Sequence, residues 1–267
     1  MHQENSFLTL TLDEEHYKPS LDHRDFQLFM KRLRAQHKRA LGKGRRTDAL
    51  DRNNNRGRPA NMGHSPIPLS YYMAGEYGSQ HRRPHYHACI FGWRPKDLIY
   101  WRKTKAGSKL YTSEHLDKLW GKGFTSIGDV NFESAAYIAR YIMAKITGKD
   151  AWKYYQHVNE DTGEITDLKP EYNRMSLGKA TAIGKTWLQK YKTDVYPEGK
   201  ILVRKFKSTT PEYYDRQYKK EEPNQYEQMK MERELQALEY RNDNTDSRLK
   251  AKERVKRAQI NSLLRIL

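Results

Sequence analysis

Cysteine is almost absent from the 267-residue chain, which holds only Cys89. A single cysteine cannot form a disulfide within the chain, and this favours a reducing compartment. No apolar run approaches the roughly 18 residues that a membrane-spanning helix needs. The first seven residues are polar and lack a signal-peptide pattern. The sequence therefore predicts a soluble, intracellular protein with no membrane partner.

Acidic residues are scarce relative to basic ones, with 33 Asp and Glu against 50 Lys and Arg, and the formal net charge is +17. An excess this large predicts a polyanionic partner. Nucleic acid and an anionic membrane surface both fit the charge, and the intracellular prediction favours nucleic acid. The hydrophobic fraction is only 36%, so we expect a compact domain with a polar, poorly packed tail.

Positive charge is concentrated in residues 31–60, where eleven Lys and Arg face only Asp48 and Asp51, giving a net charge of +9. We expect this window to bind backbone phosphates, which gives affinity without reading sequence. A solvated loop without a partner is the alternative. The nucleic-acid contacts expected here are Lys31, Arg34, Lys38, Arg39, Arg45 and Arg46.

Hydrophobic periodicity predicts a mixture of strands and helices. Alternating apolar and Thr residues over 7–12 indicate a strand with one buried face. A helix with Ser20 or Asp22 as its cap is expected over 20–40, followed by a long basic loop over about 41–65. Further strands are expected at 67–77, 85–93 and 124–130, and further helices at 114–120 and 134–147.

The C-terminal part differs in composition from the rest of the chain. Charged residues and Tyr dominate from about residue 201, with seventeen Lys and Arg and eleven Asp and Glu over 200–267. Helices are expected at 227–238 and 249–267. The sequence therefore predicts one folded domain at 1–200 and a charged, partly helical tail at 201–267.

Two histidines stand two residues apart in the strand expected over 85–93. Side chains two apart in a strand share a face, so His85 and His87 point the same way. Neighbouring imidazoles can bind a metal ion together, although an isolated His-x-His pair is weak evidence in a chain with ten histidines. Glu76 ends the preceding strand, and antiparallel pairing would bring it to the histidines. These ligands suit Mg²⁺ or Mn²⁺, with Zn²⁺ able to compete. Alternatively, Glu76 is an exposed acid at a strand end.

Tyr137, Tyr141 and Lys145 are spaced four residues apart. On the helix expected over 134–147 they would form one stripe beside an apolar stripe. A tyrosine phenol can accept a phosphoryl group once it loses its proton, and a metal ion and Lys⁺ favour that attack. Tyr141 would lie nearer to Lys145, which favours it slightly as the first nucleophile. Chance clustering is the alternative, because the chain holds 19 tyrosines.

Together, the histidine motif and the downstream tyrosine helix resemble the HUH endonucleases, rolling-circle replication initiators with two catalytic tyrosines. The order of the motifs resembles their replication-initiator branch rather than the conjugative relaxases. Several segments resemble the initiators of gokushoviruses, small single-stranded DNA bacteriophages of the microvirus family. The resemblance covers about residues 5–192 and departs from the family at 176–185, which lacks the family's proline. The segments that carry it are 75–78, 83–92, 133–141 and 173–176.

The resemblance implies an α+β fold of the HUH endonuclease type, ferredoxin-like or RRM-like, with a central antiparallel sheet and flanking helices. It implies that a metal ion held by Glu76, His85 and His87 polarises a phosphate of the single-stranded phage origin. One tyrosine would then attack, keep the 5′ end and release a 3′-OH for a host polymerase, with a host helicase as a further partner. The other tyrosine would act when the replication fork returns.

In that scheme Lys145 stabilises developing negative charge, and Arg140 and Arg174 are further expected DNA contacts. The compartment would be the cytoplasm of the host bacterium. Three other classes fit less well. A phosphodiesterase with two His-x-Thr motifs would need a second motif copy, which this chain lacks. A non-catalytic DNA-binding protein would need neither Glu76 nor paired tyrosines, and the same holds for an RNA-binding or scaffold protein.

Overall fold

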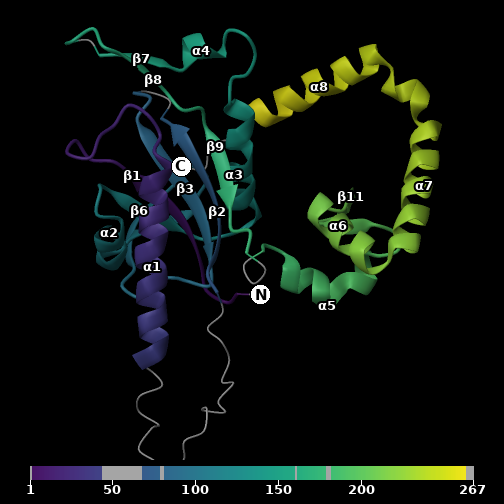
Figure 1. Cartoon of the computed structure of the whole chain (residues 1–267), viewed down its shortest axis with the longest axis horizontal. Helices are drawn as coiled ribbons and strands as arrows, with labels where there is room; N and C mark the ends of the chain where they lie inside the picture. Colours follow the sequence, from purple (N-terminus) through teal and green to yellow (C-terminus); the bar gives the residue numbers. More distant parts are fainter. Residues whose placement is uncertain (1, 44–67, 79–80, 160, 179–181, 263–267) are drawn as a thin grey trace, which may run out of the picture. The chain divides into compact units, whose positions relative to one another are not determined.

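The computed structural model describes residues 2–43, 68–78, 81–159, 161–178 and 182–262, with the side chains of 41–43 and 141–144 outside that description. The chain forms two compact units, His2–Ile183 and a second unit that begins at Gly184 (Figure 1). The sequence placed the change near residue 200. The second unit begins earlier because Leu188 and Val195 of α5 (Lys185–Val195) are buried with side chains of later helices.

The first unit is built on a seven-stranded sheet in the order β4-β5-β6-β1-β3-β2-β9. All its neighbouring strands are antiparallel, including the pair expected from residues 67–77 and 85–93. This confirms the α+β class and is consistent with an HUH-type fold. The strands are β1 (Asn5–Thr11), β2 (Ser70–Tyr77), β3 (Pro84–Phe91), β4 (Ile99–Lys103), β5 (Lys109–Thr112), β6 (Thr125–Gly128) and β9 (Tyr172–Met175).

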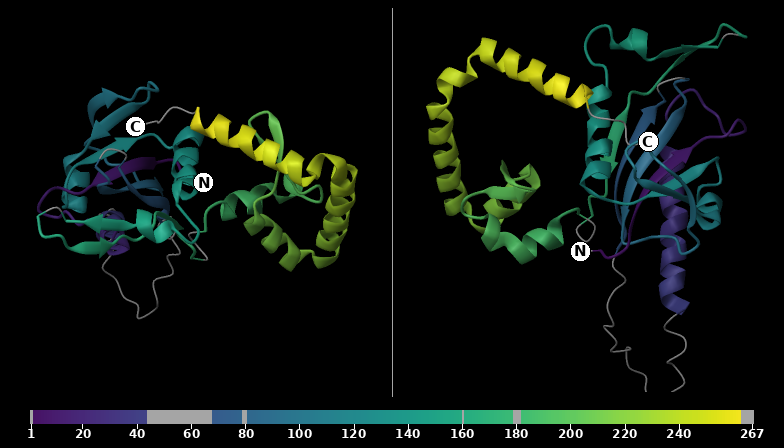
Figure 2. Two further views of the ribbon diagram at one scale, coloured as in Figure 1. Left: turned by 90° about the horizontal axis from the view of Figure 1, so that it is seen from above. Right: turned by 180° about the vertical axis from the view of Figure 1, so that it is seen from behind.

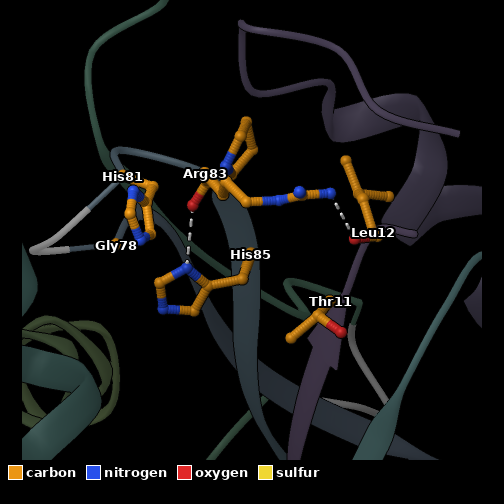
Figure 3. A pocket seen from close by; sticks show the side chains of 7 residues that line it. Thr11, Leu12, Gly78, His81, Arg83 and His85 are labelled. Carbon is orange, nitrogen blue, oxygen red and sulfur yellow. Dashed lines mark hydrogen bonds between the residues drawn. The ribbon is translucent and has the colours of Figure 1, made fainter. Parts of the chain in front are cut away.

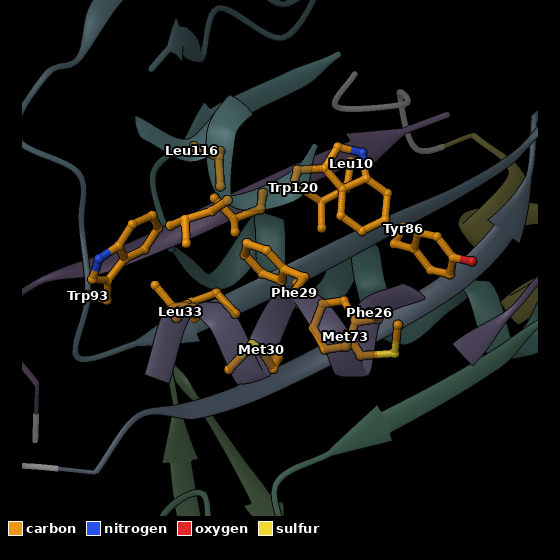
Figure 4. Packing of buried hydrophobic residues seen from close by; sticks show 14 of the residues in the cluster. Leu10, Phe26, Phe29, Met30, Leu33, Met73, Tyr86, Trp93, Leu116 and Trp120 are labelled. Atoms are coloured by element: carbon orange, nitrogen blue, oxygen red, sulfur yellow. The ribbon is translucent and has the colours of Figure 1, made fainter. Parts of the chain in front are cut away.

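One face of the sheet is covered by α1 (His23–Lys43) and α2 (Glu114–Trp120). Phe26, Phe29 and Leu33 recur on one side of α1 and are fully buried against the sheet, together with Tyr86 and Trp120 (Figure 4). This stripe is the one expected from the helical spacing. The larger hydrophobic core of the unit therefore lies between α1, α2 and this face.

The ends of α1 and α2 show which capping predictions hold. The Asp22 carboxylate accepts the Arg24 N–H just ahead of α1 at 3.0 Å, whereas the Ser20 hydroxyl accepts the Lys169 N–H. Ser113 caps α2 by accepting the Leu116 N–H, as expected, and Gly121 ends that helix in the left-handed conformation. The loop expected over 41–65 lies outside the described residues, apart from 41–43 at the end of α1.

The opposite face of the sheet is covered by α3 (Phe132–Ala144). Its buried cluster is smaller and consists of Phe7, Ala74, Cys89, Tyr137 and Ile138. Because side chains alternate along a strand, the residues at odd positions in β1 and β3 face α3. The two faces can be compared in the views of Figure 2.

The bounds of α3 differ from the expected helix at 134–147. Asn131 caps the helix through a capping box with Ser134, which starts it at Phe132. The helix ends at Ala144, and Lys145 follows with φ −59° and ψ 122°. The prediction that Tyr137, Tyr141 and Lys145 share one helical stripe is therefore wrong for Lys145, and Gly148 does not end the helix.

Residues between α3 and β9 form a short helix, α4 (Ala151–Tyr154), and a hairpin of β7 (Gln156–Val158) and β8 (Ile165–Asp167). Tyr155 links this segment to the end of α3, because its hydroxyl accepts the Ile146 N–H at 3.0 Å. The same hydroxyl donates to the buried carboxylate of Glu171 at 2.6 Å. The chain just after the tyrosine helix is thus held by a buried polar pair.

The second unit has a small core of its own, made by Leu188, Val195, Tyr196, Tyr218 and Met229. It is therefore more than a polar tail, although the helices expected at 227–238 and 249–267 do match α7 and α8 in part. No helix of the described residues is long and apolar enough to cross a membrane. The elements after α5 are β10 (Lys200–Val203), β11 (Phe206–Thr209), α6 (Glu212–Glu221), α7 (Pro223–Glu239), η1 (Arg241–Asn244) and α8 (Asp246–Asn261).

Candidate active site

Glu76, His85 and His87 meet on the sheet face that α3 covers. The register places Glu76 of β2 opposite His85 of β3, with His87 two residues further along β3. Oε1 of Glu76 contacts Nε2 of His85 and lies 2.7 Å from Nε2 of His87. One ligand atom from each residue lies within 4.8 Å of the other two. The sequence prediction that these three side chains converge is correct.

Hydrogen bonds on the far side of each imidazole orient the two rings. Nδ1 of His85 lies 3.1 Å from the Arg83 carbonyl oxygen, which can only accept, so Nδ1 carries the proton and donates (Figure 3). That leaves the lone pair of Nε2 directed at Glu76 in the neutral ring. Nδ1 of His87 lies 3.2 Å from the hydroxyl of Thr9, its register partner on β1. Such contacts fix the ring orientation and tautomer of metal-binding histidines.

Burial and charge act in opposite directions on this cluster. Burial opposes ionisation of Glu76, but the imidazoles of His87 and His85 outweigh it and hold the pKa of the carboxyl below its ordinary value. Burial lowers the pKa of His87, which keeps that ring neutral. Burial also opposes the charged form of His85, yet the hydrogen bond and the charge of Glu76 raise its pKa. The cluster thus combines a carboxylate with a neutral imidazole.

These residues fit a divalent metal ion. Oε2 of Glu76 is buried and has no hydrogen-bond partner among the described residues. A buried carboxylate oxygen without a partner is costly, and a bound cation would satisfy it. Two imidazole nitrogens and a carboxylate suit Mn²⁺ or Mg²⁺, and the same atoms can bind Zn²⁺.

Tyr137 lies beside this cluster. Its ring centroid is 5.3 Å from that of His87 in an edge-to-face arrangement and 6.3 Å from that of Phe7. The side chain is buried, and the Arg140 guanidinium lies 5.8 Å from its ring centroid. The sequence did not show this contact, because it depends on how α3 packs across β1 and β3. The structure therefore brings the tyrosine helix and the histidine motif together.

The other expected site residues lie elsewhere. Tyr141 is on α3, but its side chain lies outside the description, and the exposed Lys145 follows the helix. Arg174 is on β9 with its guanidinium over Tyr172. Its register partner Met73 packs with α1, so Arg174 faces away from the cluster. Arg45 and Arg46 lie outside the described residues. The exposed residues on α1, which covers the opposite face, are Lys31, Arg34, Lys38 and Arg39.

Sequence reasoning missed several residues that support the site. Thr9 and Arg83 orient the histidines, and only the strand register reveals them. Asn173 lies in a segment that carried the family resemblance. Its side-chain amide donates to the Tyr72 hydroxyl and to the Ile138 carbonyl of α3, which ties the helix to the sheet edge.

A pocket of about 390 Å³ adjoins the cluster. Thr11, His81, Arg83 and His85 line it, so one metal-ligand candidate borders the pocket (Figure 3). Arg83 is held there by Glu14 and by the Leu12 carbonyl oxygen. The pocket gives a ligand access to His85.

Comparison with known proteins gives the family. A family model of replication-associated proteins of the ORF2 type matches residues 5–146, more than half of the chain. The chain belongs to this family. The family match includes Glu76, His85, His87 and both tyrosines of α3.

Curated relatives of the family come from small viruses of bacteria. The replication-associated protein VP4 of Bdellovibrio phage phiMH2K is 34% identical over 228 residues, covering 85% of this chain and 61% of the relative. The replication-associated protein ORF2 of Spiroplasma virus 4 is 30% identical over 229 residues, with 81% and 58% covered. For ORF4 of Chlamydia phage 1 the values are 24% over 219 residues, with 80% and 45% covered.

These matches confirm the resemblance to replication proteins of gokushovirus-type microviruses. The chain spans about three fifths or less of the length of the curated relatives it matches. No solved structure matches the chain.

Proposed function

We propose that the chain is a replication initiator that nicks single-stranded DNA at a phage origin and stays covalently attached to the cut 5′ end. The observation that carries this proposal is the contact between Tyr137 and His87, which sets a phenol beside a metal-binding cluster. A non-catalytic DNA-binding protein would have no need for this pairing. Membership of a family of replication-associated proteins supports the same function.

In the proposed reaction, Glu76, His85 and His87 hold a divalent cation, Mg²⁺ or Mn²⁺. When bound, the cation polarises the scissile phosphate and neutralises developing charge. Thr9 and the Arg83 carbonyl keep both imidazoles aimed at that position. The pocket beside His85 gives the DNA strand room to approach.

A tyrosine of α3 attacks the phosphorus atom. A bond forms between the phenolic oxygen and phosphorus, the bond from phosphorus to the 3′-oxygen breaks, and the phenolic proton is finally carried by the released 3′-OH. The products are a 5′-phosphotyrosine and a 3′-end that a host polymerase can extend while a host helicase unwinds the duplex. Tyr137 and Tyr141 are one helical turn apart, about 6 Å, so the second tyrosine can take over when the fork returns.

Positive charge near α3 completes the proposal. Arg140 lies over the ring of Tyr137, and Lys145 follows the last turn of the helix. Both are placed to offset negative charge on the phosphate or the phenolate. Because the relatives are proteins of phages, the proposed site of action is the cytoplasm of the host bacterium.

The proposal is tested by incubating the protein with single-stranded origin DNA and Mn²⁺ and running a denaturing gel. The initiator gives a protein–DNA adduct that survives denaturation, and EDTA abolishes it. The variant with Tyr137→Phe and Tyr141→Phe should give no adduct. Tyr154→Phe, at an exposed tyrosine of α4, is the matched control and should react like the wild type. DNA binding without any adduct would favour the non-catalytic alternative.

A further inference from the structure

An exposed aromatic pair lies at the edge of the sheet, outside the cluster described above. The rings of Trp101 on β4 and Phe124, just before β6, have centroids 4.9 Å apart. Trp101 is 42% exposed and Phe124 is 47% exposed. Large aromatic side chains at a surface cost hydration free energy, so their exposure next to each other points to a ligand.

The local backbone explains why Trp101 reaches Phe124. The register between β4 and β5 shifts between Tyr100 and Arg102, which leaves Trp101 without a partner residue. Such irregularities re-aim side chains at sheet edges. Tyr100, the residue before it, packs instead against Tyr111 on the side of the larger core. Neighbouring aromatic residues of β4 thus serve opposite sides of the strand.

The pair is connected to the cluster through one row of the sheet. The Phe124 carbonyl oxygen accepts hydrogen bonds from the Thr11 N–H at 3.0 Å and the Thr11 hydroxyl at 2.8 Å. Thr11 is the register partner of His85, which in turn faces Glu76. Two strand spacings, about 10 Å, separate the backbones of Phe124 and His85. Thr11 and His85 also line the pocket beside the cluster.

The charge around the pair matches a polyanion. The β4–β5 hairpin, residues 99–112, holds four basic residues and no acidic one. All five residues of β4 are exposed, and the Arg102 guanidinium lies 4.2 Å from the Trp101 ring centroid. Lysines and arginines alone would protect an edge strand from pairing with another chain. They do not explain the exposed Trp101 and Phe124 beside them. The basic residues are Arg102, Lys103, Lys105 and Lys109.

We propose that Trp101 and Phe124 form a stacking platform for bases of the single-stranded DNA, with Arg102 and Lys103 contacting its phosphates. Exposed aromatics beside basic side chains are how proteins bind single strands without sequence preference, because every base has a π-face. The platform rests on the proposed function for the identity of its ligand. It would hold the strand a short distance from the scissile phosphate on the sheet face of the cluster.

The test measures binding of a labelled oligothymidine of about 16 nucleotides to the full chain in EDTA, by fluorescence anisotropy. Trp101→Leu and Phe124→Leu should each weaken binding by between about five-fold and about a hundred-fold, the range for removing the stacking partner of one base. Trp101→Phe should retain most of the affinity because it keeps an aromatic face. Tyr100→Leu, on the other side of the same strand, is the matched control and should bind like the wild type. Equal melting temperatures would show that the variants are folded.

Two further arms identify the kind of contact. The double variant with Arg102→Gln and Lys103→Gln should flatten the plot of log K against log salt, by roughly 0.7 for each phosphate that the protein no longer binds. Trp101→Leu should leave that slope unchanged. Affinity for a duplex of the same length should not depend on Trp101, since duplex bases are already stacked on one another.

The platform is overturned if Trp101→Leu binds the oligothymidine like the wild type, or if Tyr100→Leu loses as much affinity. It is also overturned if Trp101→Leu changes only the sedimentation mass of DNA-free protein, which would make the pair a contact between two copies. Because binding is measured without metal ions, failure of the nicking proposal leaves this result intact. Conversely, adduct formation with no role for Trp101 would remove the platform alone.

Discussion

The ring of Tyr137 stands edge-on to the ring of His87, with centroids 5.3 Å apart and an interplanar angle of 80°. The two residues come from different motifs, fifty positions apart in the chain. They meet because α3 packs on the sheet face where the odd-numbered residues of β3 point. This contact makes the cluster and the tyrosine helix parts of one site.

Metal binding should stabilise the first unit through His85. At a Mn²⁺ concentration 100 times the Kd, the expected gain is about 2.7 kcal/mol, seen as a higher melting temperature. His85→Ala removes one ligand and should abolish that gain. His81→Ala, an exposed residue lining the adjoining pocket, is the control and should keep it. An equal Mn²⁺ response in wild type and His85→Ala would mean that the ion binds elsewhere.

Neutralising the basic side of α1 should weaken DNA binding without changing catalysis once DNA is bound. The reason is that α1 covers the sheet face opposite the cluster. Replacing Lys31, Arg34, Lys38 and Arg39 by Gln should reduce affinity alike on every sequence and flatten the salt dependence by roughly 0.7 for each phosphate no longer bound. Adduct formation at saturating DNA should be unchanged.

A variant with the same loss of charge on α8 controls for the general effect of net charge. Its substitutions would be at Lys250, Arg254, Lys256 and Arg257, all exposed. If both variants lose affinity equally, α1 is not a specific contact surface and only the overall charge of the chain matters.

Tyr155 should influence the tyrosine helix through the chain that follows it. Tyr155→Phe removes the hydroxyl that accepts the Ile146 N–H and leaves the buried Glu171 without its donor. We expect a loss of about 1–3 kcal/mol in the free energy of unfolding. We also expect slower adduct formation with unchanged DNA affinity, because the end of α3 is held less firmly. Tyr154→Phe, next to it and exposed, should show neither change. Faster or unchanged adduct formation in Tyr155→Phe would contradict this role.

Acid should loosen the second unit through Asp215. Burial opposes the charged carboxylate, but hydrogen bonds from Arg233, Thr210 and Tyr196 outweigh it and lower the pKa of Asp215. A lowered pKa in the folded state means that this stabilisation is full above the unfolded value of about 3.9 and is lost as pH falls through the folded value. Hydrogen exchange in α6 and α7 should therefore rise below about pH 4.

Asp215→Asn should lose this stabilisation already at pH 7, by about 1–3 kcal/mol, and flatten the acid response. Glu212→Gln, at an exposed acid of the same helix, is the control and should behave like the wild type. An acid response that Asp215→Asn leaves unchanged would show that other carboxylates control it.

The local elements were predictable wherever one face of a segment is consistently apolar. Alternation in β1, the stripe of Phe26, Phe29 and Leu33 on α1, and the Ser113 cap of α2 are short-range patterns, and the structure agrees with them. The convergence of Glu76 with His85 and His87 was also predictable, because a hairpin pairing fixes which residues face each other.

The remaining features depend on contacts between distant segments. The strand at Ile99–Lys103 escaped prediction because all five residues are exposed and no face is apolar. The end of α3 at Ala144 was placed too late, since the buried Tyr155 and Glu171 hold the following chain. The start of the second unit near Gly184 was missed because the partners of Leu188 and Val195 lie up to forty residues later.

The most direct measurement is tryptic mapping of the covalent adduct. Trypsin cleaves after Lys122, Arg140 and Lys145, so Tyr137 and Tyr141 fall in separate peptides, 123–140 and 141–145. After reaction with single-stranded origin DNA and Mn²⁺ and digestion by nuclease, mass spectrometry should find the nucleotide mass on one or both of these peptides. A nucleotide on any other tyrosine-containing peptide, or on none, would contradict the proposed site.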